Sequence, residues 1–385
     1  MRKLYPRRYD LGDATFSRSS SAYGSDGKLA TTNIPRIDRT KFGKMVWIEE
    51  ATTNLVPVAN QKFVGWSAHG GASVILTQNQ AVPEWGATDA TRIQTNGGTH
   101  ILKYYISLQS PSVDGQAYVA SLHIKNIGNH PVMFHTNLSF TSTQTIDAGE
   151  TTLVKIAGVG NGVNIFQIQI RALDAAHALD FIAWQPMAEA KAYATSFIET
   201  SRAAESLTMP TAGLSPSVGT IEGIVEITDV VKRNTDYGWI FQLARSGTGD
   251  MRFYHGDDGN FYLQIRNDSN VMILEVTISD DALRNSLYYY KLYWLESNFK
   301  IEFWDVLTRD KTVEKIFVAR DTPSSFVICR IGGVGSTSFS TYANTRFGRH
   351  RLSNIARTTD PDFNNLMPRD EYTVALFDPT YTFLR

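Results

Sequence analysis

The 385-residue sequence has almost no cysteine, no long apolar run and almost no net charge. Its single cysteine, Cys329, excludes a disulfide within the chain and any metal site that needs several cysteines. No apolar stretch approaches the roughly 18 residues of a membrane-spanning helix, so we expect no membrane insertion. The 37 basic and 38 acidic residues nearly cancel to a net charge of -1, so we expect no nucleic-acid partner.

Common catalytic and targeting patterns are also missing. There is no G-x-S-x-G, P-loop or Rossmann glycine pattern, and the 8 histidines include no pair at the helical zinc spacing with a glutamate between them. The basic N-terminus has no apolar stretch behind it, so it does not predict a signal peptide. Glu222 and Glu226 share one predicted strand, but four strand residues span about 13 Å, more than the separation of a glycosidase carboxylate pair. We therefore predict no catalytic residue.

Short β-strand patterns fill the sequence from residue 55 onward. The alternation of Phe166, Ile168 and Ile170 with two glutamines is typical of a strand with one buried face. Turn-forming pairs such as Asp114-Gly115 separate the strands. The first series of predicted strands covers 72–77, 90–93, 100–108, 116–125, 131–140, 151–157, 164–171 and 178–184. Many short strands with recurring turns predict an all-β sandwich, and eight of them suit a jelly roll.

A second series of predicted strands follows in the C-terminal half. It covers 219–228, 239–243, 251–255, 260–266, 271–278, 287–295, 299–305, 313–319, 325–331 and 344–352. Residues 201–216 hold two prolines and a glycine without a sustained apolar period, which predicts a linker. The expected fold class is therefore all-β: an extended N-terminal arm at 1–54, a jelly-roll domain at 55–200, a linker at 201–216 and a second β-sandwich at 217–385.

Three stretches carry a resemblance to known families. The order of short motifs at the start resembles a segment of phage and prophage structural proteins of the tail, collar or fibre type: Thr15-Phe16-Ser17-Arg18, Asp26-Gly27, Pro35-Arg36 and Glu49-Glu50-Ala51-Thr52-Thr53-Asn54-Leu55. Residues 189–200 resemble the last strand of carbohydrate-binding-like jelly rolls, although Met187 and Lys191 depart from the usual Gln and Gly. Residues 353–358 and 373–378 resemble the end of a concanavalin A-like or laminin-G-like sandwich.

The resemblance implies a non-enzymatic virion protein, assembled in the host cytoplasm and released by lysis. Its implied partners are other virion proteins, host cell-surface polysaccharide and further copies of itself, with a trimer favoured. In this interpretation residues 1–54 are an attachment arm with contact residues Tyr5, Tyr9, Phe16 and Arg18, and a flexible terminus is the alternative. Two other functions stay open: a purely architectural or capsid-decorating subunit, and a polysaccharide depolymerase.

Aromatic side chains are the candidates for contact with sugar rings, which stack on flat apolar faces. The candidates are Trp66, Trp85, Tyr288, Tyr290, Trp294 and Trp304. The alternative for each is the core, because successive residues of a strand face opposite sides. Asp257, Asp258 and Asn260 around Gly259 resemble the start of a calcium loop, and an ordinary hairpin turn is the alternative. We expect no other cofactor.

Overall fold

The computed structural model covers the whole chain. It describes residues 8–20, 22–23, 29–30, 32–40, 43–49, 51–69, 73–85, 87–96, 103–109, 112–139, 143–174, 177–191, 194–202, 205–226, 238–245, 249–255, 260–278, 287–332, 345–363, 367–377 and 380–382. These ranges hold β-strands and two short 3-10 helices but no α-helix, which confirms the all-β fold class. No helix in the same ranges has the length and apolar character to cross a membrane.

The chain forms two compact units, each described here by itself. The middle unit contains Ser21–Leu29 and Thr52–Arg202, and the C-terminal unit contains Met1–Ser20, Ala30–Ala51 and Ala203–Arg385. This division differs from the expected one, because most of the expected arm belongs to the C-terminal unit. The expected linker is also divided, between β18 (Ser201–Arg202) of the middle unit and β19 (Ser206–Met209) of the C-terminal unit.

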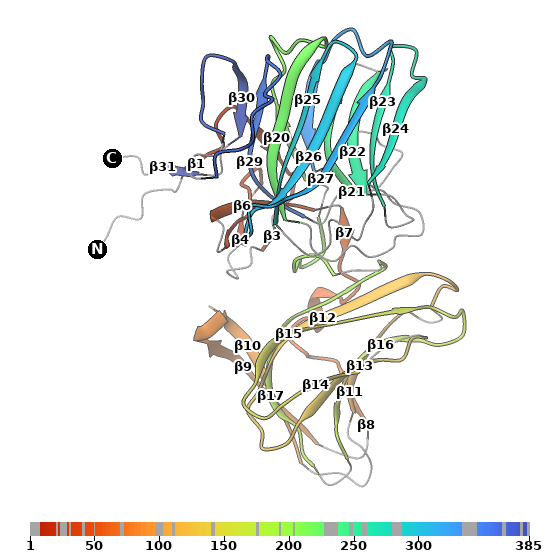
Figure 1. Ribbon diagram of the computed structural model, residues 1–385. Coiled ribbons are helices and arrows are strands. Elements are labelled where there is room, and N and C mark those ends of the chain that lie inside the picture. Colours follow the sequence, from red (N-terminus) through yellow and green to blue (C-terminus); the bar gives the residue numbers. More distant parts are fainter. Residues whose placement is uncertain are drawn as a thin grey trace. The chain divides into compact units, whose positions relative to one another are not determined.

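The middle unit is a sandwich of two five-stranded antiparallel sheets (Figure 1). The sheet orders are β15-β12-β17-β10-β9 and β14-β13-β16-β11-β8. Both sheets contribute side chains to one apolar core, in which Phe166, Ile168 and Ile170 of β16 are fully buried as their alternation predicts. The elements are β7 (Thr52–Thr53), η1 (Val58–Asn60), β8 (Ser67–His69), β9 (Val74–Val82), η2 (Pro83–Trp85), β10 (Ala87–Thr95), β11 (Lys103–Gln109), β12 (Ala117–Asn126), β13 (Val132–Thr136), β14 (Gln144–Ile146), β15 (Thr151–Val159), β16 (Phe166–Ala172) and β17 (Asp180–Glu189).

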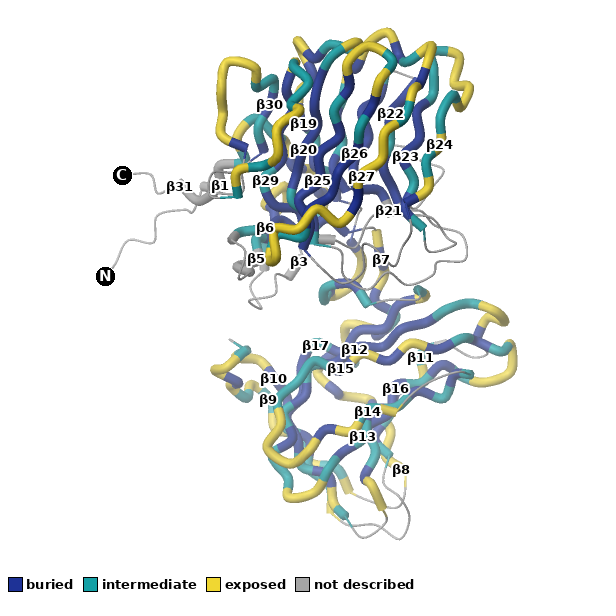
Figure 2. Tube along the Cα trace, in the orientation of Figure 1, coloured by how far each residue is buried: buried dark blue, intermediate teal, exposed yellow. Residues whose placement is uncertain are grey.

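The C-terminal unit is a larger sandwich. One sheet has the order β2-β19-β28-β21-β22-β23-β24, and the other has the order β27-β26-β25-β20-β29-β6-β5 with β30 paired to β29. Buried residues follow the strands of both sheets (Figure 2) and form a single large apolar core. The strands after β19 are β20 (Val218–Glu226), β21 (Gly238–Ala244), β22 (Asp250–His255), β23 (Phe261–Arg266), β24 (Met272–Ile278), β25 (Leu287–Leu295), β26 (Asn298–Asp305), β27 (Lys311–Val318), β28 (Ile328–Ile331), β29 (Thr345–Ser353), β30 (Thr373–Phe377) and β31 (Thr380–Thr382).

Most of the N-terminal strands belong to this C-terminal unit: β1 (Arg8–Asp10), β2 (Thr15–Ser17), β5 (Ile37–Thr40) and β6 (Gly43–Ile48). β3 (Ala22–Tyr23) and β4 (Leu29–Ala30) form a separate two-stranded sheet, and β3 and the first residue of β4 fall in the middle unit. β2 pairs with β19 and β6 pairs with β29, so both large sheets include N-terminal strands. Phe16 is 5% exposed and packs in the core with Val46 and Ile48. The segment therefore completes a domain, and the expectation that Phe16 contacts a neighbouring subunit is wrong.

Arg18 is also misassigned as a contact residue, because it lies in a buried ion network. Its Nη1 is 2.7 Å from Glu205 Oε1, while Arg36 Nη2 is 2.6 Å from Glu205 Oε2. Arg36 Nη1 also lies 2.5 Å from Glu49 Oε2, and all four side chains are at most 1% exposed. Burial alone would lower the pKa of Arg36, but the Glu49 and Glu205 carboxylates raise it above its ordinary value.

The other two expected contact residues cannot be assigned a role from the structure. Tyr5 lies outside the described residues, and for Tyr9, in β1, only the backbone is described. β1 pairs with β31, with Tyr9 opposite Tyr381 in the register. The two ends of the C-terminal unit are therefore joined by backbone hydrogen bonds.

Candidate functional site

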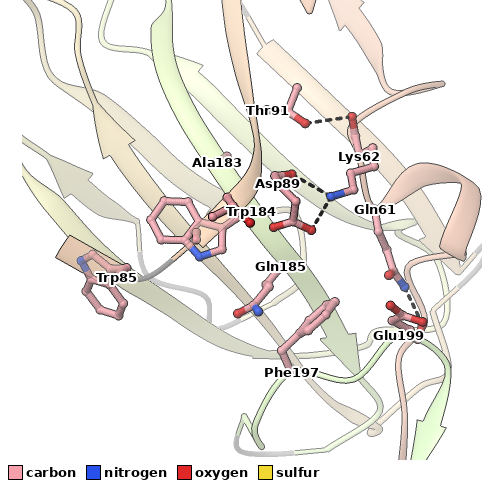
Figure 3. Close-up of a pocket in the computed structure, with 12 residues that line it drawn as sticks. Gln61, Lys62, Trp85, Asp89, Thr91, Ala183, Trp184, Gln185, Phe197 and Glu199 are labelled. Atoms are coloured by element: carbon pink, nitrogen blue, oxygen red, sulfur yellow. Dashed lines mark hydrogen bonds and ion pairs between the residues drawn. The ribbon is translucent and has the colours of Figure 1, made fainter. Parts of the chain in front are cut away.

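A pocket in the middle unit is the candidate ligand site. Its volume is about 320 Å³, and it opens beside strands β10 and β17 and the turn η2. Figure 3 shows Trp85 and Trp184 toward one end, and Gln61 and Glu199 toward the other. The lining residues are Gln61, Lys62, Trp85, Ala87, Thr88, Asp89, Thr91, Ala183, Trp184, Gln185, Phe197 and Glu199.

The aromatic end of the pocket is built by η2, which connects β9 to β10. Proline at position 83 fixes the backbone angle that begins this turn, and the turn holds Trp85 over the outer face of the sheet. The Trp85 ring lies 4.7 Å from the His123 ring and 6.2 Å from the Trp184 ring, measured between centroids. Trp184 is only 4% exposed, whereas Trp85 is half-buried and keeps an accessible face.

His123 supports these two tryptophans from the neighbouring strand β12. Its ring stacks on Trp184 at 5.1 Å with an interplanar angle of 13°. Burial, with a smaller contribution from the nearby Lys155 charge, lowers the pKa of His123 to about 4. The imidazole is therefore neutral at physiological pH, and the aromatic end of the pocket carries no charge from this side chain.

A β-bulge places Gln185 in the pocket. The register of β17 against β12 shifts between Trp184 and Met187, so that two residues, Gln185 and Pro186, oppose the single residue Leu122. Proline has no N–H to donate to the ladder and is tolerated at such irregularities. Gln185 has a φ of 54°, a left-handed conformation that is uncommon for residues other than glycine. The bulge thus directs an amide with donors and acceptors toward the cavity.

Polar side chains form the other end of the pocket. Lys62 Nζ donates to the backbone oxygen of Asp89 at 2.7 Å and pairs with the Asp89 carboxylate at 2.5 Å, while both side chains stay exposed. Gln61 is buried, and its Nε2 donates to the backbone oxygens of Val56 and Glu199. Glu199 itself is exposed and lines the pocket. The wall therefore offers ammonium, carboxylate and amide groups to a ligand.

This arrangement is suited to binding a ligand that has both apolar faces and hydroxyl groups. Small-ligand sites combine aromatic walls with a few placed polar groups, as this pocket does. Trp85 and the half-buried Phe197 offer ring surface, and Gln185, Lys62 and Asp89 offer hydrogen bonds. No cluster of three or more His, Cys, Asp or Glu side chains with metal-binding geometry occurs among the described residues.

Of the six aromatic residues predicted to stack on sugar rings, Trp85 lines the pocket. The prediction is wrong for the other five aromatic residues. Trp66 is 7% exposed and packs between Phe63 and Tyr104, with ring centroids at 4.9 and 5.6 Å. Four more are at most 5% exposed: Tyr288, Tyr290, Trp294 and Trp304. A ring without an accessible face cannot stack on a sugar, so these residues hold the cores together.

Tyr288 and Tyr290 face the core because they are alternate residues of β25. Trp304 faces the opposite side of its sheet, where Tyr289 and Met367 pack against it. The aromatic content of these strands therefore reflects two buried layers.

The remaining candidates concern carboxylates and calcium. Asp257 and Asp258 lie outside the described residues, and Asn260 alone is described, immediately before β23. Glu222 is 2% exposed, accepts a hydrogen bond from the Tyr289 hydroxyl and pairs with Arg351. Glu226 Oε2 lies 2.9 Å from Arg346 Nη1. Both glutamates are thus engaged in ion pairs within the C-terminal unit.

Sequence reasoning did not identify most of the pocket. Lys62, Asp89, Gln185 and Phe197 come from separate elements, and their side chains meet only after the sheet has formed. One local signal was available: a proline inside an apolar strand pattern, at position 186, indicates a bulge. Bulges are common beside binding sites, so this position could have directed attention to Gln185.

Comparison with solved structures of other proteins finds distant similarities of fold. No family model and no curated protein matches the chain. The chain is similar to the enzymatically active domain of tailspike protein 2 of bacteriophage CBA120, with a TM-score of 0.36 and 8% identity over 46% of this chain and 29% of that one. It is also similar to a Bacteroides ovatus protein whose name describes it as carbohydrate-binding. The TM-score is 0.31 and the identity 13%, over 74% of this chain and 85% of that one.

Laminin-type domains give a third likeness. Domains LG4-5 of the mouse laminin alpha1 chain match with a TM-score of 0.28 and 8% identity, covering 72% of this chain and 92% of that chain. The chain spans less than a third of the tailspike chains that it matches. All of these TM-scores lie below 0.5, so no function is carried over from these structures.

Proposed function

We propose that the middle unit binds a glycan in the pocket beside Trp85 and that this binding attaches a bacteriophage virion to its host. The observation that carries the proposal is the half-buried Trp85 ring at the end of a polar-walled cavity of about 320 Å³. Sugar rings present apolar C–H faces to aromatic rings and hydroxyl groups to amides and charged groups. The pocket offers both kinds of surface at once.

The size and construction of the pocket support a short glycan segment as the ligand. A volume of about 320 Å³ lies at the lower end of the range for small-ligand sites, roughly 300–1,000 Å³. Trp184, His123 and the β17 bulge fix the ring and the amide before a ligand arrives, which reduces the entropy lost on binding. Such a site binds each glycan weakly, and a homo-oligomer, for which we favour a trimer, gains affinity through multivalency.

The virion setting and the lack of catalysis are parts of the same proposal. The motif order in residues 14–55 supports a tail, collar or fibre component that contacts other virion proteins. The engagement of Glu222 by Tyr289 and Arg351, and of Glu226 by Arg346, supports a non-enzymatic role, because neither carboxylate is available as an acid or a base.

The direct test is binding of the purified full chain to an array of bacterial surface glycans, followed by titration calorimetry with the best ligand. Replacing Trp85 with Ala is expected to weaken binding at least about 10-fold, because the sugar ring of the ligand loses its stacking partner. The matched control is Tyr105→Ala, which removes a half-buried ring from β11 of the opposite sheet. The control is expected to bind like the wild type.

Other results would redirect the proposal. An array without binding by any oligomeric form would favour an architectural or capsid-decorating subunit. Release of reducing ends from host polysaccharide by the wild type would indicate a depolymerase instead. Equal binding by Trp85→Ala and wild type would show that glycan binding occurs elsewhere on the chain.

A further inference from the structure

One sheet of the middle unit carries basic side chains and no acidic ones. This sheet has the order β14-β13-β16-β11-β8 (Figure 1), and none of its five strands contains Asp or Glu. Its basic residues are His69, Lys103, His135 and Arg171. The neighbours of the last three in sequence, Tyr104, Phe134 and Ile170, pack in the core of the unit. Because successive strand residues face opposite sides, the three basic side chains lie on the outer face.

The strand register brings like charges together on this face. Arg171 of β16 lies opposite Lys103 of β11, which in turn lies opposite His69 of β8. Side chains directly opposite each other in an antiparallel pair share one face, with Cβ atoms about 4.5–5.5 Å apart, and like charges there are destabilising. No carboxylate pairs with Lys103 or Arg171 in the described part of the chain. The sheet therefore carries two adjacent positive charges that it does not neutralise itself.

The basic groups of this face reach solvent. Lys103, His135 and Arg171 are half-buried, and His69 is exposed. The sheet on the other side of the unit treats two of its basic residues differently. There Arg92 Nη2 lies 2.8 Å from Asp180 Oδ2, and Lys125 Nζ lies 2.5 Å from Glu84 Oε1. The lack of acidic partners thus distinguishes the face around Arg171 from the opposite face of the same unit.

His135 shows that the two positive charges act on their surroundings. It lies opposite Gln169 in the row next to Arg171. Burial lowers the pKa of His135 to about 4, and the Arg171 and Lys103 charges contribute to the shift. Partial burial also lowers the pKa of Arg171 below its ordinary value. An anion bound beside these side chains would stabilise the charged form of each.

A chain of hydrogen bonds holds the Arg171 guanidinium in place. Its Nε donates to Gln169 Oε1 at 2.7 Å, Gln169 Nε2 donates to Gln167 Oε1 at 2.7 Å, and Gln167 Nε2 donates to Ser107 Oγ at 3.0 Å. Within the residues that the structure describes, the two Nη groups of Arg171 have no partner. A guanidinium end with two parallel N–H groups matches the two oxygens of a carboxylate. The side chain is therefore preorganised for an anion.

We propose that this outer face, centred on Lys103 and Arg171, is a second glycan site and that it takes an acidic, carboxylate-bearing polysaccharide. Charge complementarity supports the acidic ligand, because the two cations lie side by side without a carboxylate. The amides of Gln167 and Gln169 and the exposed hydroxyl of Ser107 lie next to them and suit the hydroxyl groups of a sugar.

This site is separate from the pocket beside Trp85. The pocket is lined from β10 and β17, which belong to the other sheet of the middle unit, and it contains both Lys62 and Asp89. The second site contains positive charges alone on its strands. The inference extends glycan binding to another surface and does not depend on a ligand in the pocket.

The test is titration of the full chain with an oligomer of galacturonic acid at low ionic strength, followed by calorimetry. We expect the wild type to bind and to lose affinity as salt is added. The methyl ester of the same oligomer, which has no charge, should bind at least about 10-fold more weakly. Lys103→Gln and Arg171→Gln should each weaken binding about 10-fold, because each removes a charge-assisted contact. The matched control is Lys315→Gln, which removes a positive charge from an exposed position on β27 in the C-terminal unit.

Unfolding in urea gives an independent measurement on the same variants. Lys103→Gln removes one of two like charges that lie opposite each other, so the midpoint for the middle unit should stay unchanged or rise. Arg171→Gln also loses the hydrogen bond from Nε to Gln169, which makes Lys103→Gln the cleaner variant. Weaker binding by a Lys103→Gln protein of full stability would support the site, whereas a lowered midpoint would show that Lys103 has a structural role and would count against it.

The binding outcomes separate the second site from the pocket. Trp85→Ala is expected to bind the acidic oligomer like the wild type. Loss of binding in Trp85→Ala together with wild-type affinity in Lys103→Gln and Arg171→Gln would place the acidic ligand in the pocket and overturn the proposal. No binding by the wild type at millimolar oligomer would also overturn it, and would leave binding of neutral glycans in the pocket to its own test.

Discussion

Replacement of Glu205 by Gln is expected to be among the most destabilising single changes in the C-terminal unit. The Glu205 carboxylate accepts from Arg18 Nη1 at 2.7 Å, Arg36 Nη2 at 2.6 Å and the backbone N–H of Glu49 at 2.8 Å. Glutamine keeps the size of the side chain but removes its charge. Arg18 then keeps acceptors such as the backbone oxygens of Ala30 and Ile34, yet its charge loses the Glu205 carboxylate.

The magnitude follows from the burial of the network. Each hydrogen bond to a charged group contributes about 1.5–3 kcal/mol, and three of them end on Glu205. The amide can still accept from one or two of these donors, so part of this free energy remains. Removing one partner from a buried ion pair costs about 3–5 kcal/mol, and we expect the free energy of unfolding to fall by that amount.

The assay is equilibrium unfolding in urea, followed by a signal that reports the C-terminal unit. Because the chain has two units, the transition of this unit is fitted separately from that of the middle unit. The control is Glu314→Gln, which removes an exposed carboxylate that pairs with Lys300 and Lys311, and it is expected to lower the free energy of unfolding far less than Glu205→Gln does. A loss for Glu205→Gln no larger than that of the control would refute the reasoning.

Two further predictions concern the same unit. His350 is fully buried, and burial lowers its pKa to about 4 despite a hydrogen bond with the Gly348 carbonyl. In the unfolded state the same side chain takes up its proton near pH 6.5. The free energy of unfolding should therefore fall by about 3 kcal/mol as the pH drops from 6.5 to 4. Unfolding measured across this range should show a shallower pH dependence for His350→Asn, and an unchanged slope would contradict the assignment. Deletion of residues 1–49 removes Phe16, Val46 and Ile48 from the core, so the C-terminal unit should lose its cooperative unfolding transition, and a truncated chain with a wild-type transition would disprove this.

Much of the fold could be predicted from the sequence, because alternation of apolar residues determines which strand face is buried. The pattern in β12, β16 and β20 placed these strands correctly, and it also indicated two sandwiches. Strands β8 and β14 of the middle unit were missed, since three residues are too few to show alternation. The residues of β6 were expected to form a short strand, but β2 was missed for another reason: its partner β19 lies more than 150 residues away in sequence.

The candidate site could be predicted less well, because its residues are brought together only by tertiary structure. Aromatic side chains attract attention as sugar platforms, but Tyr290 and Trp294 fill the core as any large apolar residue would. Whether a ring is accessible depends on what packs above it, and this is not encoded in the strand that carries it. Trp85 differs because it lies in a short turn between two strands, where a side chain can stay partly exposed.

The buried network around Glu205 gives the N-terminal motifs a physical role. Arg18 belongs to the first motif, Arg36 follows Pro35 in another, and Glu49 begins the last, and all three side chains take part in the network around Glu205. The spacing of these motifs thus matches the path that the chain takes past one buried carboxylate. A buried network that lacks one of its charged groups leaves another charge buried and unpaired, which costs free energy. The complete network therefore specifies how these segments dock on the sheets. The motifs that resemble those of virion proteins therefore mark the assembly of this domain.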